Sequence, residues 1–214
     1  LRFQAVLPGS DTARRFRQEI FAWYVQDRWL LSPRLTLEAS LRHEWNTTPR
    51  EAQGKLSNLD RLTDLTPRTS GPLFRNPSLR NFAPRAGLAW DPAGDGKTVL
   101  RAGYGVHYDL ILSHFLLLAG VRNPPHFLLG QVRGPRPGAF PSGAWSQLAS
   151  GASLDLRMER LDPAPPQPYV QHWNVSVARR PASGFQWEAG YVGSHGLNLS
   201  TIVEDANLVP WTRL

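Results

Sequence analysis

Several residue types are absent or scarce in this chain of 214 residues. There is no cysteine, which excludes disulfides and thiolate metal sites. Lysine occurs only at Lys55 and Lys97, although Lys and Arg together number 24 and the net charge is +7. The arginines are scattered along the chain, so we interpret the charge as a compositional bias and expect no nucleic-acid partner.

Long hydrophobic runs are also absent. No stretch of about 18 apolar residues is present, which excludes a transmembrane helix. A membrane β-barrel is not excluded, because its strands need only about 9–11 residues each and alternate in polarity. No signal peptide is visible at Leu1 to Gln4. The 19 prolines and 18 glycines suit a turn-rich β protein.

The tripeptide Gly96-Lys97-Thr98 is like the end of a phosphate-binding loop. That motif needs a glycine five residues earlier, where Asp91 stands, and a helix after it. The residues after Thr98 instead alternate with period two, and 92–96 has the composition of a turn. We therefore predict a β-hairpin here and no nucleotide site.

Alternation of apolar and polar residues predicts six strands in three hairpins, at about 20–45, 82–109 and 168–199. The clearest strand runs from Arg34 to Trp45 and alternates over its whole length, which an amphipathic helix would not do. The turns within the hairpins are short. The connections between them, about 46–81 and 110–167, are long and rich in proline, although Ile111 to Val121 is apolar enough for a short helix.

This asymmetry of connections indicates a membrane protein. Loops of such length argue against a compact soluble domain, whereas outer-membrane barrels alternate short periplasmic turns with long extracellular loops. Aromatic residues fall toward the predicted strand ends, as in an interfacial girdle: Trp29, Trp45, Trp90, Tyr108, Tyr169 and Tyr191. We predict an all-β fold, an antiparallel up-and-down meander of about six strands that is part of a large transmembrane β-barrel.

Three segments resemble consecutive parts of the barrel of TonB-dependent, Oar-like outer-membrane receptors. They read WYVQDRWLLSPRLTLEASLRHEW, FAPRAGLAWDPAGDGKTVLRAGYGVHYD and PYVQHWNVSVARRPASGFQWEAGYVGSHGLNL. The matches occur in the order of the family and cover about half of the chain. These motifs are made of strand and turn residues, so they carry architecture and give no information on the solute.

The resemblance implies a barrel of about 22 strands, plugged by an N-terminal domain and energised through TonB. Neither a plug nor a TonB-contacting segment is recognisable in 1–214, and six strands are fewer than the usual minimum of about eight. We therefore expect an internal fragment of a receptor that binds and imports a solute in the outer membrane of a Gram-negative bacterium. Its partners would be outer-membrane lipid, the remaining strands and plug, and the TonB system.

No catalytic or metal-binding pattern is visible, and we expect no enzyme activity and no cofactor. The six histidines have no metal-ligand spacing and suggest structural or lumen-facing roles; they are His43, His107, His114, His126, His172 and His195. Five carboxylates are candidates for the lumen, namely Asp27, Glu38, Glu44, Asp109 and Glu188. Four arginines are candidates to line a path for an anionic solute, namely Arg34, Arg42, Arg85 and Arg101. The binding residues for the solute stay unassigned.

An alternative hypothesis is a soluble, secreted β module that binds glycan or protein through surface aromatics, namely Trp23, Trp45, Trp173 or Trp187. The two hypotheses differ in what the apolar strand faces contact. The barrel hypothesis predicts that no second layer covers them and that they face lipid. The soluble module predicts a packed core between two sheets.

Overall fold

The computed structural model describes residues 2–110, 118–133, 138, 142–149, 158–181 and 184–201. Its largest element is a six-stranded sheet with the order β10-β9-β7-β6-β4-β3, in which all neighbours are antiparallel. The strands are β3 (Ile20–Ser32), β4 (Leu35–Asn46), β6 (Phe82–Trp90), β7 (Thr98–Tyr108), β9 (Tyr169–Arg179) and β10 (Trp187–Leu197). The predicted all-β, up-and-down meander is confirmed.

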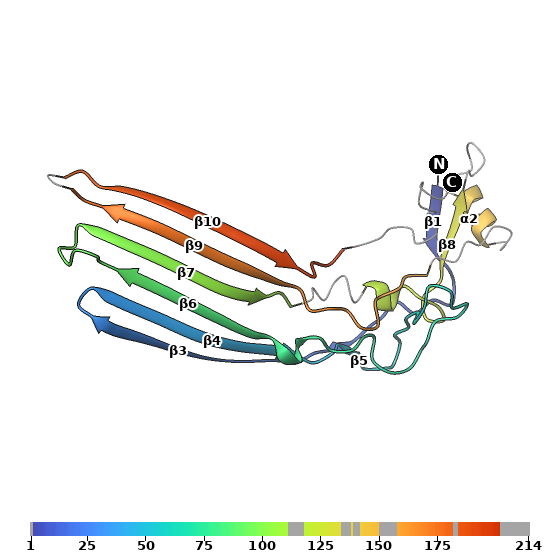
Figure 1. The fold of residues 1–214 in the computed structure, drawn as a ribbon. Coiled ribbons are helices and arrows are strands. Elements are labelled where there is room, and N and C mark those ends of the chain that lie inside the picture. The colour runs from blue at the N-terminus through green and yellow to red at the C-terminus, as the bar shows by residue number, and fades with distance from the viewer. Residues whose placement is uncertain are drawn as a thin grey trace.

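The three short turns lie at one end of this sheet, and the long connections lie at the other (Figure 1). We call the second region the cap; it comprises residues 2–19, 47–81 and the described part of 109–168. The cap contains β1 (Arg2–Val6) paired with β8 (Leu129–Arg133), β2 (Phe16–Arg17) paired with β5 (Arg50–Glu51), η1 (Ser78–Arg80) and α2 (Ser142–Ala149).

The expected short helix at Ile111 to Val121 falls partly outside the described residues. Positions 118–121 are helical, and 111–117 are among those that the structure does not describe. Among the described residues, no helix is long and apolar enough to cross a membrane.

Cross-strand register gives the sheet one apolar and one polar face. Residues directly opposite each other on neighbouring strands point to the same side. One such row runs from Trp29 through Leu37, Leu88, Ala102 and Val175 to Tyr191. The positions between these residues form the polar face. The alternation in the separate strands therefore adds up to a continuous apolar surface.

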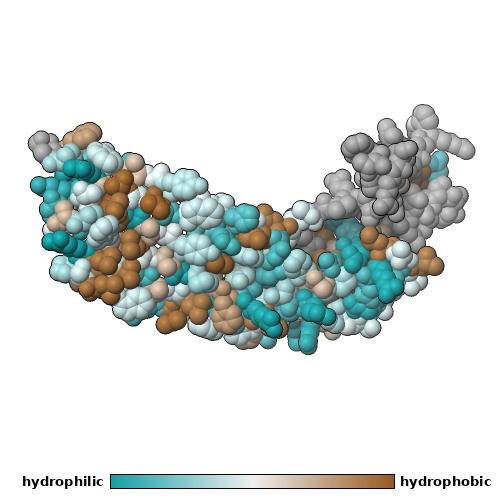
Figure 2. Space-filling model, in the orientation of Figure 1, coloured by the Kyte–Doolittle hydropathy of each residue, from teal (hydrophilic) through white to brown (hydrophobic). Residues whose placement is uncertain are grey.

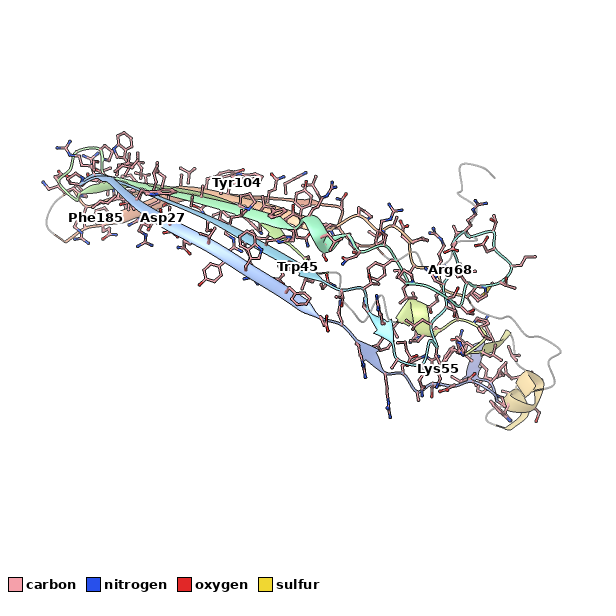
Figure 3. All side chains as sticks on the ribbon, turned by 90° about the horizontal axis from the view of Figure 1, so that it is seen from below. Asp27, Trp45, Lys55, Arg68, Tyr104 and Phe185 are labelled. Carbon is pink, nitrogen blue, oxygen red and sulfur yellow. The ribbon has the colours of Figure 1, made fainter. Side chains whose placement is uncertain are left out.

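The apolar face has no covering layer in the described part of the chain. Val175 is 53% exposed and Tyr191 65% exposed. The buried apolar residues lie mainly in the cap, at Leu59, Leu73, Phe74, Ala119, Val132, Ala144 and Leu148, and the sheet contributes only Ala83 and Ala178. The nearly edge-on view shows the sheet as a single layer beside the cap (Figure 3). Brown side chains lie over the strands, and teal ones are denser at the turn end and over the cap (Figure 2).

Aromatic side chains gather at both ends of the apolar face. At the cap end, Phe21 stacks on Trp45 with ring centroids 5.3 Å apart, and Tyr108 lies 5.5 Å from Tyr169. At the turn end, Trp29, Trp90 and Trp187 are near the strand termini. Phe21 and Trp29 are about 27 Å apart along the strand, or about 20 Å across a bilayer at a tilt near 40°, close to the apolar band of about 25 Å in membrane barrels.

The placement of Tyr191 at a strand end is wrong. Tyr191 is opposite Val175 in the middle of β10. β10 begins at Trp187 and continues to Leu197, so Tyr191 has strand residues on both sides of it. Trp187 therefore takes the interfacial position.

Two buried asparagines hold the cap together. The side-chain amide of Asn123, which is 0% exposed, donates to the carbonyl oxygens of Ser57, Ala119 and Glu159, and its Oδ1 accepts the Glu159 N–H at 2.7 Å. Asn58 joins its neighbours in the same way, donating to Leu73 and Leu161 and accepting the Leu161 N–H at 2.9 Å. Polar side chains thus connect the two long connections.

Replacing Asn123 with alanine should loosen the cap and leave the sheet intact. The substitution leaves several buried backbone groups unpaired, at a cost of about 1–3 kcal/mol for each group. A loss of about 3 kcal/mol corresponds to roughly a 100-fold faster proteolysis of the cap, if cleavage follows local opening. The measurement is limited proteolysis of outer membranes with mapping of the cleavage sites. Gln53→Ala, on the cap surface, is the matched control, and equal cleavage of the two variants would contradict the role of Asn123.

Candidate functional site

The polar face of the sheet carries most of the side chains that were predicted to face a lumen. The cross-strand register places there the following residues: Glu38, Arg42, Glu44, Arg85, Arg101, His107, His172 and Glu188. Asp109 follows β7, and its backbone N–H donates to the carbonyl oxygen of Pro168. Arg34 lies in the turn between β3 and β4, and its guanidinium packs against Gly94 of the next turn. Arg34 is therefore not part of the wall.

The prediction that Asp27 faces the lumen is wrong. Asp27 is opposite Ala39 on the apolar face, because β3 keeps its alternation through this position. Its Oδ1 accepts the backbone N–H of Arg28 at 2.8 Å. That bond satisfies part of the carboxylate without moving it to the other side of the sheet.

An ionic cluster lies on the polar face at the β3 edge of the sheet, between β3 and β4. The guanidinium of Arg28 donates to Oε2 of Glu38 from Nε at 3.0 Å and from Nη2 at 2.7 Å, and the amide of Gln26 donates to Oε1 at 2.8 Å. Gln26 and Arg28 are exposed, and Glu38 is half-buried. Such a polar lining is expected for a surface that faces water. The positive charge of Arg28 is paired with the negative charge of Glu38.

Pro84 opens the sheet at the cap end of β6. Proline has no N–H to give to a neighbouring strand. The pairing of β6 with β7 stops at Arg85 opposite Gly105, although both strands continue toward the cap. A small hollow of about 70 Å³ lies there, and its lining includes Arg42, Glu44, Arg85 and His107.

Gly105 gives these side chains room to converge. A row across the polar face runs from Arg85 through Gly105 to His172. A Cβ at Gly105 would lie 3.0 Å from Nε2 of His107 and 3.3 Å from Cγ of Arg85. Because glycine has no Cβ, Nη2 of Arg85 lies 3.4 Å from Nδ1 of His107. The His107 and His172 rings meet edge to face, with ring centroids 5.2 Å apart.

The volume of this hollow and the side chains that line it limit what it can bind. A space of about 70 Å³ admits a few water molecules and no organic solute. Arginine only donates, so the contact with His107 requires an unprotonated Nδ1. Among the described residues, no three His, Asp or Glu side chains gather as they would around a metal ion. The arrangement can hold water and orient a passing anion, and it does not form a closed binding pocket.

The remaining histidines have separate surroundings. His43 lies on the apolar face, stacked between Trp45 at 4.7 Å and Phe82 at 4.2 Å. His195 is opposite Gln171 on the same face. In the cap, the carbonyl oxygen of His126 accepts the N–H of Asp11. His114 lies outside the described residues.

The tripeptide Gly96-Lys97-Thr98 belongs to a hairpin turn, as predicted. Thr98 begins β7, and no helix follows it. Asp91 organises the turn, because its carboxylate oxygens accept the N–H groups of Gly94 and Gly96 at 2.8 Å each. Gly94 and Gly96 have φ values of 74° and 69°, which favour glycine. Asp91, which stands where a phosphate-binding loop would have its first glycine, is thus the residue that organises this turn.

The turn should therefore depend on pH. The hydrogen bond from Gly96, followed by that from Gly94, holds the pKa of Asp91 below its ordinary value. A depressed folded-state pKa stabilises the turn above the unfolded-state pKa of about 3.9, and this contribution is lost as the pH falls through the folded-state value. We expect the amide resonances of Gly94 and Gly96 to shift together below pH 3.9 in a detergent-solubilised sample. An Asp91→Asn variant should show no such transition, and a common midpoint above 3.9 would contradict the assignment.

A single-layer sheet with one exposed apolar face, one ionic face and aromatic residues at both margins is the wall of a membrane β-barrel. The chain matches the family model described as "Outer membrane beta barrel domain" over residues 5–212, and it belongs to that family. It is an outer-membrane protein of a Gram-negative bacterium. No curated protein and no solved structure matches the chain.

The alternative of a soluble, secreted module is wrong. It required a packed core between two sheets, and the described residues have none beside the apolar face. The four tryptophans of that hypothesis all lie on the apolar face, namely Trp23, Trp45, Trp173 and Trp187.

The assignment of the two sheet faces can be tested with arginine substitutions at two adjacent positions, Val175→Arg and Asn174→Arg, which lie at nearly the same depth in the membrane. Val175 is on the apolar face and Asn174 on the polar face of β9. Arginine on the lipid face near the midplane costs about 2–4 kcal/mol, whereas the same residue on the polar face meets water. We expect Val175→Arg to reduce the amount of protein assembled in outer membranes by a factor of ten or more, and Asn174→Arg to leave it near the wild-type level. Equal losses, measured by immunoblot of outer-membrane fractions, would reverse the assignment of the faces.

Proposed function

We propose that this chain is part of the barrel of a TonB-dependent, Oar-like receptor that binds and imports a solute and performs no catalysis. The support is the order of three motifs, which coincide with β3–β4, β6–β7 and β9–β10. In the second of them, the Asp91 carboxylate and the glycines at 94 and 96 form one hydrogen-bonded turn. The motif residues thus have a structural reason to occur together.

The observation that carries the proposal is the open sheet. β3 and β10 are its two edges, and they do not pair with each other. Each exposes a row of backbone N–H and C=O groups along 13 and 11 residues respectively. An unpaired group costs several kcal/mol in lipid, so each open edge would cost on the order of tens of kcal/mol. Further strands of the same receptor close the barrel in this proposal.

The position of the cap gives the barrel an orientation. Outer-membrane barrels place short turns in the periplasm and long loops outside the cell, so the cap is extracellular and the turn at Asp91 periplasmic. Because the hollow near Arg85 holds only a few waters, solute selection is assigned to the cap. In this proposal, the receptor also contains a plug domain and is energised through TonB. The polar face of the sheet forms part of the wall of the barrel lumen.

The test compares what bacteria remove from their medium. Strains lacking this protein, lacking TonB, or lacking both are grown in a complex medium, and the small molecules left behind are measured by mass spectrometry. We expect one chemical class to stay in the medium of all three strains and to disappear when the missing gene is restored. Depletion that continues without TonB contradicts TonB coupling, and depletion that is unchanged without this protein contradicts import. Immunoblots of outer membranes control for protein level.

A further inference from the structure

A second, larger hollow lies in the cap, beside the ribbon formed by β2 and β5. Figure 1 shows β5 between the six-stranded sheet and the rest of the cap. Its volume is about 930 Å³, enough for an organic molecule. Three arginines line it, Arg17 of β2, Arg50 of β5 and Arg75 of the segment that leads to η1. All three are exposed, and their guanidinium groups have no carboxylate partner among the described residues.

The ribbon keeps two of these charges face to face. Arg17 is directly opposite Arg50, which brings their Cβ atoms to about 5 Å. Like charges at such positions destabilise a strand pair. Backbone bonds hold the ribbon on both sides, from Ala52 N–H to the Arg15 carbonyl oxygen at 2.8 Å and from Thr47 N–H to that of Glu19 at 2.8 Å. The fold therefore maintains a repulsive pair that a bound anion would relieve.

The third arginine is fixed independently. The backbone N–H of Arg75 donates to the carbonyl oxygen of Pro163 at 2.8 Å, and the side chain of Asn76 donates to that of Asn46 at 2.6 Å. These bonds hold the 75–76 segment against the end of β4 and against the second long connection. The guanidinium groups thus come from three separate stretches of chain on one hollow.

The carboxylates beside the hollow, Glu19 and Glu51, are fewer than its arginines and leave it with a net positive charge. Glu51 is 8% exposed, and its oxygens accept backbone N–H groups from Arg15, Gln53 and Lys55. Burial opposes its ionisation, and these three bonds together hold its pKa below the ordinary value. Glu51 is thus ionised and already engaged with the backbone. Glu19 supplies the one other carboxylate of the lining.

We propose that Arg17, Arg50 and Arg75 form a binding site for a phosphate-type oxyanion. Guanidinium forks bind phosphate in bidentate geometry, and several forks on one hollow give both charge and orientation. The phosphate group belongs to a soluble molecule or to a lipid headgroup at the outer surface, and the chemistry of recognition is the same. The site does not depend on solute import, so failure of the import experiment leaves it standing.

The test uses the protein extracted from outer membranes in dodecyl maltoside, with inorganic pyrophosphate as the soluble probe and lipid A added to the micelles as the headgroup probe. We expect at least one probe to bind and to raise the melting temperature of the wild type. Arg50→Gln and Arg75→Gln should each weaken binding about tenfold, the loss expected for one charge-assisted hydrogen-bond pair. Arg50→Lys keeps the charge, loses the fork and should bind less tightly than the wild type.

The matched control is Arg80→Gln, which removes an exposed arginine of η1 outside the hollow. It should bind both probes as the wild type does. Without any probe, Arg50→Gln should melt at or above the wild-type temperature, because it removes the repulsion with Arg17; this separates lost binding from unfolding. Tighter binding of pyrophosphate than of lipid A indicates a soluble ligand, and tighter binding of lipid A indicates a headgroup. No binding of either probe, or equal binding by Arg50→Gln, Arg75→Gln and the control, would overturn the site.

Discussion

The pairing of every backbone polar group within the membrane is the constraint from which the rest of this structure follows. Lipid offers no hydrogen-bond partner, so a spanning strand must be paired along both sides. The six strands meet this requirement through antiparallel neighbours, and short turns join them in three hairpins. The two outer strands do not meet it within this sheet. The same chemistry that orders the sheet therefore requires more strands around it.

The sheet and the cap use opposite ways of handling apolar side chains. In the sheet, large apolar residues such as Val175 are exposed on one face, because lipid will cover them. In the cap, water surrounds the chain, and Leu73 and Phe74 form a buried cluster. The cap also buries asparagines, whose amides satisfy backbone groups that have no strand partner. Asn58 and Asn123 thus do in water-exposed loops what the strand ladders do in the bilayer.

The sheet was predictable from the sequence because its signals are local. Alternation identifies each strand, short turns fix the register of each hairpin, and the register then carries Arg42 and Arg85 to one face. Tyr191 was misplaced because alternation does not fix where a strand ends, and β10 continues past Tyr191 to Leu197. Asp27 was misassigned because a charge was expected to override the face that its neighbours define, and a backbone hydrogen bond made that unnecessary.

The cap and the arginine hollow were not predictable, because their contacts join residues far apart in the chain. Asn123 bonds to residues 66 and 36 positions away, and no period marks such contacts. The meeting of His107 and His172 beside Gly105 needs the β7–β9 register, which spans the second long connection. Pro84 was the one local signal for this site, since a proline within a predicted strand marks a place where pairing ends.

The pairing of β1 with β8 has a consequence for the order in which the molecule assembles. Gln4 contacts Gln131 across 127 positions of sequence, whereas each hairpin of the sheet closes over a short turn. Contacts of small sequence separation form quickly, and those of large separation wait for the chain entropy between them to be lost. We therefore expect the three hairpins to form before the β1–β8 pairing of the cap. The cap thus depends on contacts that the hairpins of the sheet do not need in order to form.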